Sequence, residues 1–261
     1  MFGRRSNINT TEASLLPTGA MLSHPGCVRE ANEDAVAYLL PAAGNRGMLA
    51  LVADGMGGHA AGEVASRIAV DTVMRLYQQL DGSPPEVLAV CLAEANRLIC
   101  ERSEAEAACA GMGTTCTVLA VRDGAAFLGH IGDSRAYLWR DGALRQISED
   151  HSLVAQLVRD GAITREEAAR SPQRHVITRA LGLEPSVKPS IWRKGLPLQA
   201  GDALVLCSDG LSDLVDDETI ASTVRGLPPA EACQRLLEQA LAAGGNDNVS
   251  VGVFAVLGGA S

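Results

Sequence analysis

The spacing of hydrophobic positions along the chain predicts three long helices. In the stretches 61–80 and 86–102, apolar residues recur every three or four positions and polar residues occupy the opposite face. This period is typical of amphipathic helices that cover a core. Pro84 and Pro85 suit the start of the second helix. A third such stretch, 228–241, places four residues on its apolar face: Cys233, Leu236, Leu237 and Ala240.

Short apolar runs predict strands at 35–40, 48–53, 115–121, 125–131, 136–139, 203–207 and 249–257. We expect the second run to stop at Ala53, because the sequence Asp54-Gly-Met-Gly-Gly58 does not suit a strand. Asp-Gly pairs at 123–124 and 141–142 indicate tight hairpins, and hence a β-meander from 113 to 147. Helices and strands come in blocks, which favours antiparallel sheets covered by helices in an α+β fold.

The polar and apolar pattern also divides the chain. Residues 1–17 are polar and without period, so we expect a flexible N-terminal tail. The charge-rich segment 148–190 predicts short helices near 151–160 and from Thr164, an N-cap residue type. It lacks a long apolar face of its own, and we expect a small subdomain laid over the main body. Residues 18–258 then form one domain, within the size range of single domains.

Charge and composition exclude several classes of partner. The chain has 261 residues and a net charge of −9, which argues against nucleic acid, since phosphate backbones require a basic face. No stretch approaches the roughly 18–20 apolar residues of a membrane span, and the N-terminus lacks the apolar region of a signal peptide. The seven cysteines show no C-x-x-C spacing and indicate reduced thiols. We therefore expect a cytoplasmic protein with no nucleic-acid or membrane partner. We also expect it to be a monomer.

Acidic residues mark the ends of the predicted strands. They are Asp54, Asp133, Asp209 and Asp247, together with the pair Glu33 and Asp34. A strand pinned by packing aims such a carboxylate rigidly. The glycine that follows Asp54, Gly55, allows close backbone approach, so its carbonyl oxygen can act as a ligand. Taken singly, however, each Asp-Gly pair indicates only a turn.

Converging carboxylates repel one another and require a cation to hold them together. The candidate set is all oxygen, without zinc-like Cys and His spacing or the loop of an EF-hand, and suits Mg²⁺, Mn²⁺ or Ca²⁺. Two cations sharing a carboxylate would activate a water and clamp a phosphoryl group. From spacing alone, a metal site and a set of turns remain equal alternatives.

Six short motifs occur in a fixed order: Arg29-Glu-Ala-Asn-Glu-Asp34, Asp54-Gly-Met-Gly-Gly-His59, Gly113-Thr-Thr115, Gly132-Asp-Ser-Arg135, Ser208-Asp-Gly-Leu211 and Asp247-Asn-Val-Ser250. With them the chain resembles the metal-dependent protein phosphatases, the PPM or type 2C family, in their compact bacterial form. The resemblance runs from about residue 20 to 257. It implies a four-layer αββα sandwich of two antiparallel sheets flanked by helices, with 148–190 as the flap subdomain.

The resemblance also implies a centre of two Mn²⁺ or Mg²⁺ ions with a third, weaker site. By motif, Asp54 would bridge both metals, the Gly55 carbonyl would bind the first, and Asp209 and Asp247 would complete the second. Glu33 and Asp34 would bind metal-bound waters or lie at the edge of the ligand set. Asp133 would form the third site with Asp209.

The implied activity is hydrolysis of phosphoserine and phosphothreonine on proteins, opposing a bacterial serine/threonine kinase. Arg29 would grip the substrate phosphate, since guanidinium offers two parallel donors. The general acid is unassigned, because Met56 stands where some members carry His, and His59 is a candidate. Cys207 lies in a buried run and does not suit a thiol mechanism. The alternatives are a phosphoesterase of small molecules and a non-catalytic regulatory module of the same fold.

Overall fold

Strand β3 (Met48–Met56) lies at the centre of the molecule and shows how its layers form. The first six residues are fully buried and alternate between two environments. Leu49, Leu51 and Ala53 pack toward two helices, whereas Met48, Ala50 and Val52 face a second sheet. A continuous apolar run is therefore buried on both faces, as in a strand enclosed between layers.

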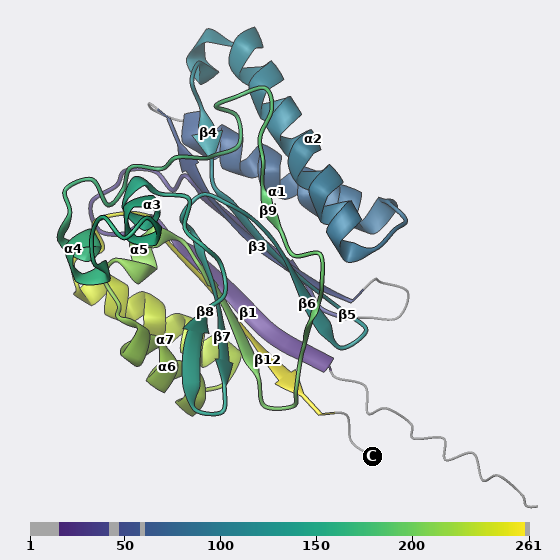
Figure 1. The fold of residues 1–261 in the computed structure, drawn as a ribbon, viewed down its shortest axis with the longest axis vertical. Coiled ribbons are helices and arrows are strands. Elements are labelled where there is room, and N and C mark those ends of the chain that lie inside the picture. Colours follow the sequence, from purple (N-terminus) through teal and green to yellow (C-terminus); the bar gives the residue numbers. More distant parts are fainter. Residues whose placement is uncertain (1–15, 42–46, 58–60, 259–261) are drawn as a thin grey trace, which may run out of the picture.

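The computed structural model describes residues 16–41, 47–57 and 61–258, and within them two antiparallel sheets stack between helical layers (Figure 1). The sheet of β3 has the order β10 (Leu196–Pro197), β6 (Ala125–Ile131), β5 (Cys116–Arg122), β3, β2 (Asp34–Leu39); β4 (Gly113–Thr114) pairs with β3 and β9 (Ser190–Ile191) with β6. The other sheet has the order β1 (Leu16–His24), β12 (Val249–Leu257), β11 (Ala203–Cys207), β7 (Arg135–Arg140), β8 (Ala143–Gln146).

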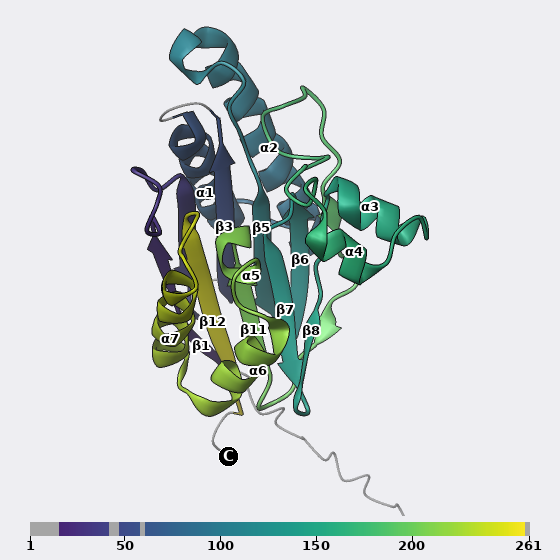
Figure 2. The ribbon, with the colours of Figure 1, turned by 90° about the vertical axis from the view of Figure 1, so that its left-hand side faces the viewer.

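Helices cover both outer faces and one end. α1 (Ala61–Gln79) and α2 (Pro84–Ala105) pack on the β3 sheet, and a 3₁₀ turn, Ala107–Cys109, follows them. α5 (Asp209–Ser212), α6 (Asp217–Gly226) and α7 (Pro229–Ala242) cover the β12 sheet (Figure 2). α3 (Leu153–Arg159) and α4 (Arg165–Arg170) project from the body within the predicted flap, and Thr164 caps α4 as expected. The predicted α+β sandwich and its three long helices are confirmed.

Two strand predictions close to Asp54 and Asp133 are wrong. β3 does not stop at Ala53 but continues to Met56, because Gly55 and Met56 pair with β4 after the pairing with β5 ends. The meander from 113 to 147 is split: β5 and β6 belong to one sheet, β7 and β8 to the other. The two Asp-Gly hairpins are correct, with φ of +52° at both Asp123 and Asp141. The chain changes sheets at 132–134, between β6 and β7.

The N-terminal strand β1 is absent from the sequence prediction. It begins at Leu16, so the last two residues of the expected tail, Leu16 and Pro17, belong to it, while residues 1–15 lie outside the described chain. Pro17 is tolerated because β1 is an edge strand. A Cβ at Gly19 would lie 2.2 Å from the Phe254 ring, so the absence of a side chain at this position leaves room for that ring. Within the described residues, no helix has the length and hydrophobicity that a membrane span requires.

Candidate metal centre

Four acidic side chains from different elements meet at one end of the sandwich. Asp34 opens β2 and lies opposite Asp54 of β3 in the strand register. Asp209 begins α5 directly after β11 of the other sheet, and Asp133 lies in the crossover between the sheets. The charges of Asp34, Asp209 and Asp133 all act on Asp54. The sequence placed these residues at strand ends, and the structure brings them together.

Burial and mutual repulsion raise the pKa of each of these carboxyls. Burial is the main cause, raising the pKa of Asp34 to about 7 and that of Asp133 to about 7. The charge of Asp209 adds to both shifts. The pKa of Asp54 is held well above its ordinary value, first by burial and then by its acidic neighbours. Four carboxyls that resist ionisation together form a site that favours a positive partner.

Two of these carboxyls have an oxygen without a protein partner. Among the described residues, Asp34 Oδ1 and Asp133 Oδ1 are buried and accept no hydrogen bond. The other oxygen of Asp34 accepts a hydrogen bond from Ser208 Oγ at 2.8 Å, which fixes the carboxyl. A buried carboxylate oxygen left unpaired is costly, and a hard divalent cation or its bound water satisfies it. The donor set fits Mg²⁺ or Mn²⁺.

The Gly113-Thr-Thr115 motif holds the backbone of Asp54. Thr114 Oγ1 and the Thr115 amide both donate to the Asp54 carbonyl at 2.9 Å, and the Asp54 amide donates to Thr115 Oγ1 at 2.9 Å. Thr115 Oγ1 also lies 2.7 Å from Ser134 Oγ in the crossover. The threonines thus set the spacing between Asp54 and the crossover that carries Asp133.

Gly55 lies where no side chain fits. Its amide donates to the Glu33 carbonyl at 3.2 Å, and a Cβ on it would lie 2.1 Å from the Gly62 carbonyl oxygen. Glu33 packs over Gly62 at the start of α1, and the Gly62 amide donates to its carboxyl. Burial nevertheless raises the pKa of Glu33 above its ordinary value, while Arg29 opposes that shift.

Arg29 and Asp247 form an ion pair at the rim of the centre. Arg29 Nη2 donates to Asp247 Oδ2 at 2.7 Å, and the two side chains are 51% and 42% exposed. Asn248, next to Asp247, binds the segment that follows Arg29. Its Oδ1 accepts a hydrogen bond from the Glu33 amide at 2.7 Å, and its Nδ2 donates one to the Ala31 carbonyl at 2.9 Å. The sequence singled out Asn248 only as a member of a motif, without this role.

The structure adds residues that sequence reasoning missed. Ligand atoms of His175, Asp209 and Asp213 all lie within 4.8 Å of one another. His175 Nδ1 is 3.4 Å from Asp213 Oδ2 and 3.8 Å from Asp209 Oδ2. Asp213 could have been predicted to lie near Asp209, because residues four positions apart share a helix face. Nothing in the sequence indicated that His175 of the flap would reach them.

Two other candidates, His59 and Cys207, remain from the sequence. His59 lies outside the described residues. Cys207 is fully buried in β11, and burial raises the pKa of its thiol to about 12, which agrees with the exclusion of a thiol mechanism. All seven cysteines fall in the described part of the chain and all are free thiols.

The N-terminal end of the flap is hydrogen-bonded to the crossover between the sheets. The His151 amide donates to the Gly132 carbonyl at 2.7 Å, and the Gly132 amide donates to His151 Nδ1 at 3.2 Å. Beyond α4 the flap returns along the segment 177–188, where Leu181 and Thr114 exchange backbone hydrogen bonds at 2.9 and 3.0 Å. Both ends of the flap are therefore bonded to the segments that position Asp133 and Asp54.

The fold and the site define an αββα sandwich protein with a buried acidic centre at one end. A family model described as Protein phosphatase 2C matches residues 28–243, and the chain belongs to this family.

Relatives and solved structures agree with this assignment. The chain is 46% identical over 242 residues to the serine/threonine protein phosphatase PstP of Mycobacterium tuberculosis, covering 91% of this chain but 45% of that protein, so it spans less than half of this relative's length. It is 36% identical over 242 residues to the protein phosphatase PhpP of Streptococcus pneumoniae, covering 91% of this chain and 96% of that one. A crystal structure of the PstP catalytic domain with two manganese ions superposes with a TM-score of 0.82 at 42% identity, covering 94% of this chain and 100% of that one.

Proposed function

We propose that this protein is a metal-dependent serine/threonine protein phosphatase that hydrolyses phosphoserine and phosphothreonine on proteins. The observation that carries the proposal is the buried cluster around Asp54, in which Asp34 Oδ1 and Asp133 Oδ1 lack partners among the described residues. Such a cluster is a poor structural core and a good cation site. The names of the related proteins support the same activity.

The proposed ligands of two Mn²⁺ or Mg²⁺ ions are Asp54, the Gly55 carbonyl, Asp209 and Asp247. Glu33 and Asp34 would hold water ligands at the edge of this set, and Asp133 with Asp209 would offer a third, weaker site. The two manganese ions of the PstP catalytic domain support this stoichiometry. When bound, the cations would neutralise the phosphate dianion and supply an acidified water as nucleophile.

Arg29 would bind the substrate phosphate. In the structure its guanidinium contacts Asp247, one of the proposed ligands, from an exposed position. Exposed ion pairs contribute little, so the exchange of Asp247 for a phosphate oxygen costs little. Two parallel N–H donors to two phosphate oxygens then orient the phosphorus toward the centre.

The proposed substrates are phosphorylated proteins, among them a bacterial serine/threonine kinase and its targets. The flap is hydrogen-bonded at both ends to the segments that position Asp133 and Asp54, which supports recognition of a chain rather than of a small molecule. We further propose that the protein acts as a monomer in the cytoplasm. The seven free thiols support a reducing location.

The test is Mn²⁺-dependent release of phosphate from a phosphothreonine peptide, with and without EDTA, beside a nucleoside monophosphate as substrate. We expect release from the peptide that EDTA abolishes and Mn²⁺ restores. Faster turnover of the nucleotide would instead identify a small-molecule phosphoesterase. No release from either substrate with Mn²⁺ or Mg²⁺ would identify a non-catalytic module.

A further inference from the structure

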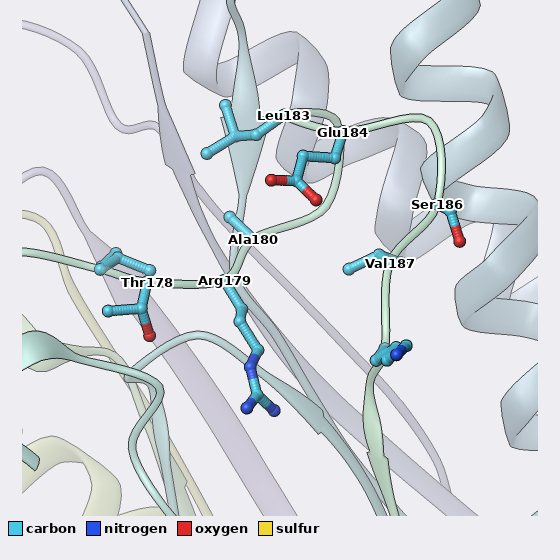
Figure 3. Close-up of a pocket in the computed structure, with 9 residues that line it drawn as sticks. Thr178, Arg179, Ala180, Leu183, Glu184, Ser186 and Val187 are labelled. Carbon is cyan, nitrogen blue, oxygen red and sulfur yellow. The ribbon is translucent and has the colours of Figure 1, made fainter. Parts of the chain in front are cut away.

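The returning arm of the flap lines a hollow (Figure 3). The hollow has a volume of about 380 Å³ and is lined by the single segment 177–188. This segment begins at the bridge between Ile177 and Ser152, pairs with Thr114 at Leu181 and leads into strand β9. The walls of the hollow combine two cations with apolar and hydroxyl side chains: Arg179, Lys188, Leu183, Val187, Thr178 and Ser186.

The two cations of the hollow have no anionic partner. Within the described part of the chain, neither Arg179 nor Lys188 forms an ion pair or a side-chain hydrogen bond, and both are exposed. Glu184 also lines the hollow, but its carboxylate and the Arg179 guanidinium point to different ends (Figure 3). The lining thus carries two cations against one carboxylate, a net positive charge on a chain of net charge −9. They make this a local positive site on an acidic protein.

The hollow adjoins the proposed centre through direct contacts. Leu181, which lies in the same segment between the lining residues Ala180 and Leu183, exchanges two backbone hydrogen bonds with Thr114, and Thr114 Oγ1 donates to the Asp54 carbonyl. From the other side, Arg179 lies close enough for its charge to act on His151, whose pKa is lowered first by burial, then by His130 and then by Arg179. His151 Nδ1 accepts a hydrogen bond from the amide of Gly132, the residue before Asp133. A peptide with its phosphate at the centre would therefore place neighbouring residues against this segment.

The chemistry of the hollow selects one class of side chain. Leu183 is 51% exposed, and with Val187 it offers apolar surface for a short aliphatic stem. The unpaired guanidinium and ammonium groups suit an anion at the end of that stem, and Ser186 adds a hydroxyl donor. A carboxylate side chain and a phosphorylated hydroxyl share this description.

We propose that the hollow is a substrate subsite that binds an anionic residue, carboxylate or phosphate, a few positions from the phosphothreonine that is hydrolysed. The inference rests on the proposed function and adds a substrate class to it. Arg179 and Lys188 act here as specificity determinants, without contact with the reacting phosphate. Preferred substrates thus carry their phosphothreonine in an acidic or multiply phosphorylated sequence.

The experiment compares peptides that share one phosphothreonine and differ at the flanking positions. One series has neutral residues, one places glutamate at single positions on either side, and one places a non-hydrolysable phosphonate analogue of phosphoserine there. For each protein variant, the ratio of kcat/KM for anionic over neutral peptides is measured, so that losses common to all substrates cancel. The carboxylate and phosphonate series separate the two sources of negative charge.

For the unaltered protein we expect a ratio of about ten at one or two flanking positions, equivalent to about 1.4 kcal/mol. In Arg179→Gln with Lys188→Gln the ratio should fall to about one, through KM. Arg165→Gln removes an exposed cation of α4 outside the hollow, without an ion pair in the described chain, and should keep the ratio. A ratio of one in the unaltered protein, or a ratio retained by the double variant, would overturn the subsite.

The proposed function and the subsite can fail separately. If the unaltered protein releases no phosphate from any peptide, the proposed function fails. Fluorescence anisotropy of the labelled phosphonate peptide, bound to the unaltered protein and to the double variant, still decides the subsite. Equal affinity for both proteins would contradict it. If Arg165→Gln also lost the preference for anionic peptides, the preference would come from the overall positive charge of the flap, which would overturn the subsite.

Discussion

Asp34, which is buried, and Asp54, which is partly buried, lie directly opposite each other on the neighbouring antiparallel strands β2 and β3. Like charges in this position destabilise a sheet, and here Asp209 and Asp133 add further negative charge. The protein therefore maintains an acidic cluster at the expense of the stability of its metal-free form. Such a cost is typical of a functional site.

The metal-free protein should lose stability as pH rises through neutrality. Asp34 and Asp133 have a pKa of about 7 in the folded chain, against roughly 3.9 when unfolded. The folded state therefore binds more protons between these values, and stability present below pH 4 is lost as pH approaches and passes 7. Burial lowers the pKa of His151 to about 3 and also lowers that of His130, so these two histidines favour folding increasingly as pH rises to about 6.5 and oppose the trend below that pH. Thermal unfolding in EDTA from pH 6.5 to pH 8 should therefore show a falling Tm, and saturating Mg²⁺ should reverse the trend. A Tm that rises with pH in EDTA would contradict these pKa shifts.

Asp54→Asn should abolish phosphatase activity and stabilise the metal-free protein. The change removes a carboxylate that the proposed metals share, and also a charge that repels three neighbours. We expect the Tm in EDTA to rise by about 2–4 °C, corresponding to roughly 1 kcal/mol for a chain of this size. Scanning calorimetry and phosphothreonine peptide turnover measure the two effects.

A matched control for that variant is Asp123→Asn. Asp123 lies in the hairpin between β5 and β6 at φ +52°, a conformation that asparagine adopts readily, and its side chain is 91% exposed. Both activity and Tm should stay near those of the unaltered protein. Normal turnover of Asp54→Asn at saturating Mn²⁺ would remove Asp54 from the proposed centre.

Local pattern predicted most of the fold, because helices and buried strands carry their period in sequence. The crossover at 132–134 was not predictable in this way. β6 and β7 share the same alternation, and only packing assigns them to different sheets. β1 was missed since Pro17 and Gly19 interrupt its pattern, although Gly19 is needed there to admit the Phe254 ring. The two-residue strands β9 and β10 are too short to carry a period.

The acidic residues of the candidate site could be predicted because each stands at the end of a strongly apolar run. Their partners could not. Ser208 donates a hydrogen bond to Asp34, from which it is separated by 174 positions in the sequence. Asn248 accepts one from the Glu33 amide, which is 215 positions away. The approach of His175 to Asp213 likewise depends on how the flap folds back. These contacts are tertiary and leave no local signal.

Arg29→Ala should raise KM for phosphopeptides about tenfold while Mn²⁺ affinity stays equal or improves slightly. The guanidinium is proposed to bind the phosphate, and charged hydrogen bonds of this kind are worth about 1.5–3 kcal/mol, less at an exposed position. Its present partner, Asp247, is a proposed ligand, so removal of Arg29 frees that carboxylate for metal. Steady-state kinetics and calorimetric Mn²⁺ titration measure the two quantities. Unchanged KM would place the phosphate site elsewhere, and Arg29→Lys, which cannot form the bidentate contact, should recover little.

Asp133→Ala should keep two tightly bound metals but lose most phosphatase activity. Asp133 is buried, with one oxygen unpartnered among the described residues. It lies in the crossover between the sheets, whereas Asp54 lies on β3 and Asp209 begins α5. The proposed two-metal set is complete without it, so its carboxylate would serve a third, largely hydrated cation, which binds weakly when few protein ligands are offered. Removing its charge relieves Asp54 and Asp209 and should raise the Tm in EDTA, as for Asp54→Asn. Calorimetric metal titration beside peptide kinetics separates the outcomes: wild-type kcat would exclude the third site, and loss of the tight metals would place Asp133 in the main centre.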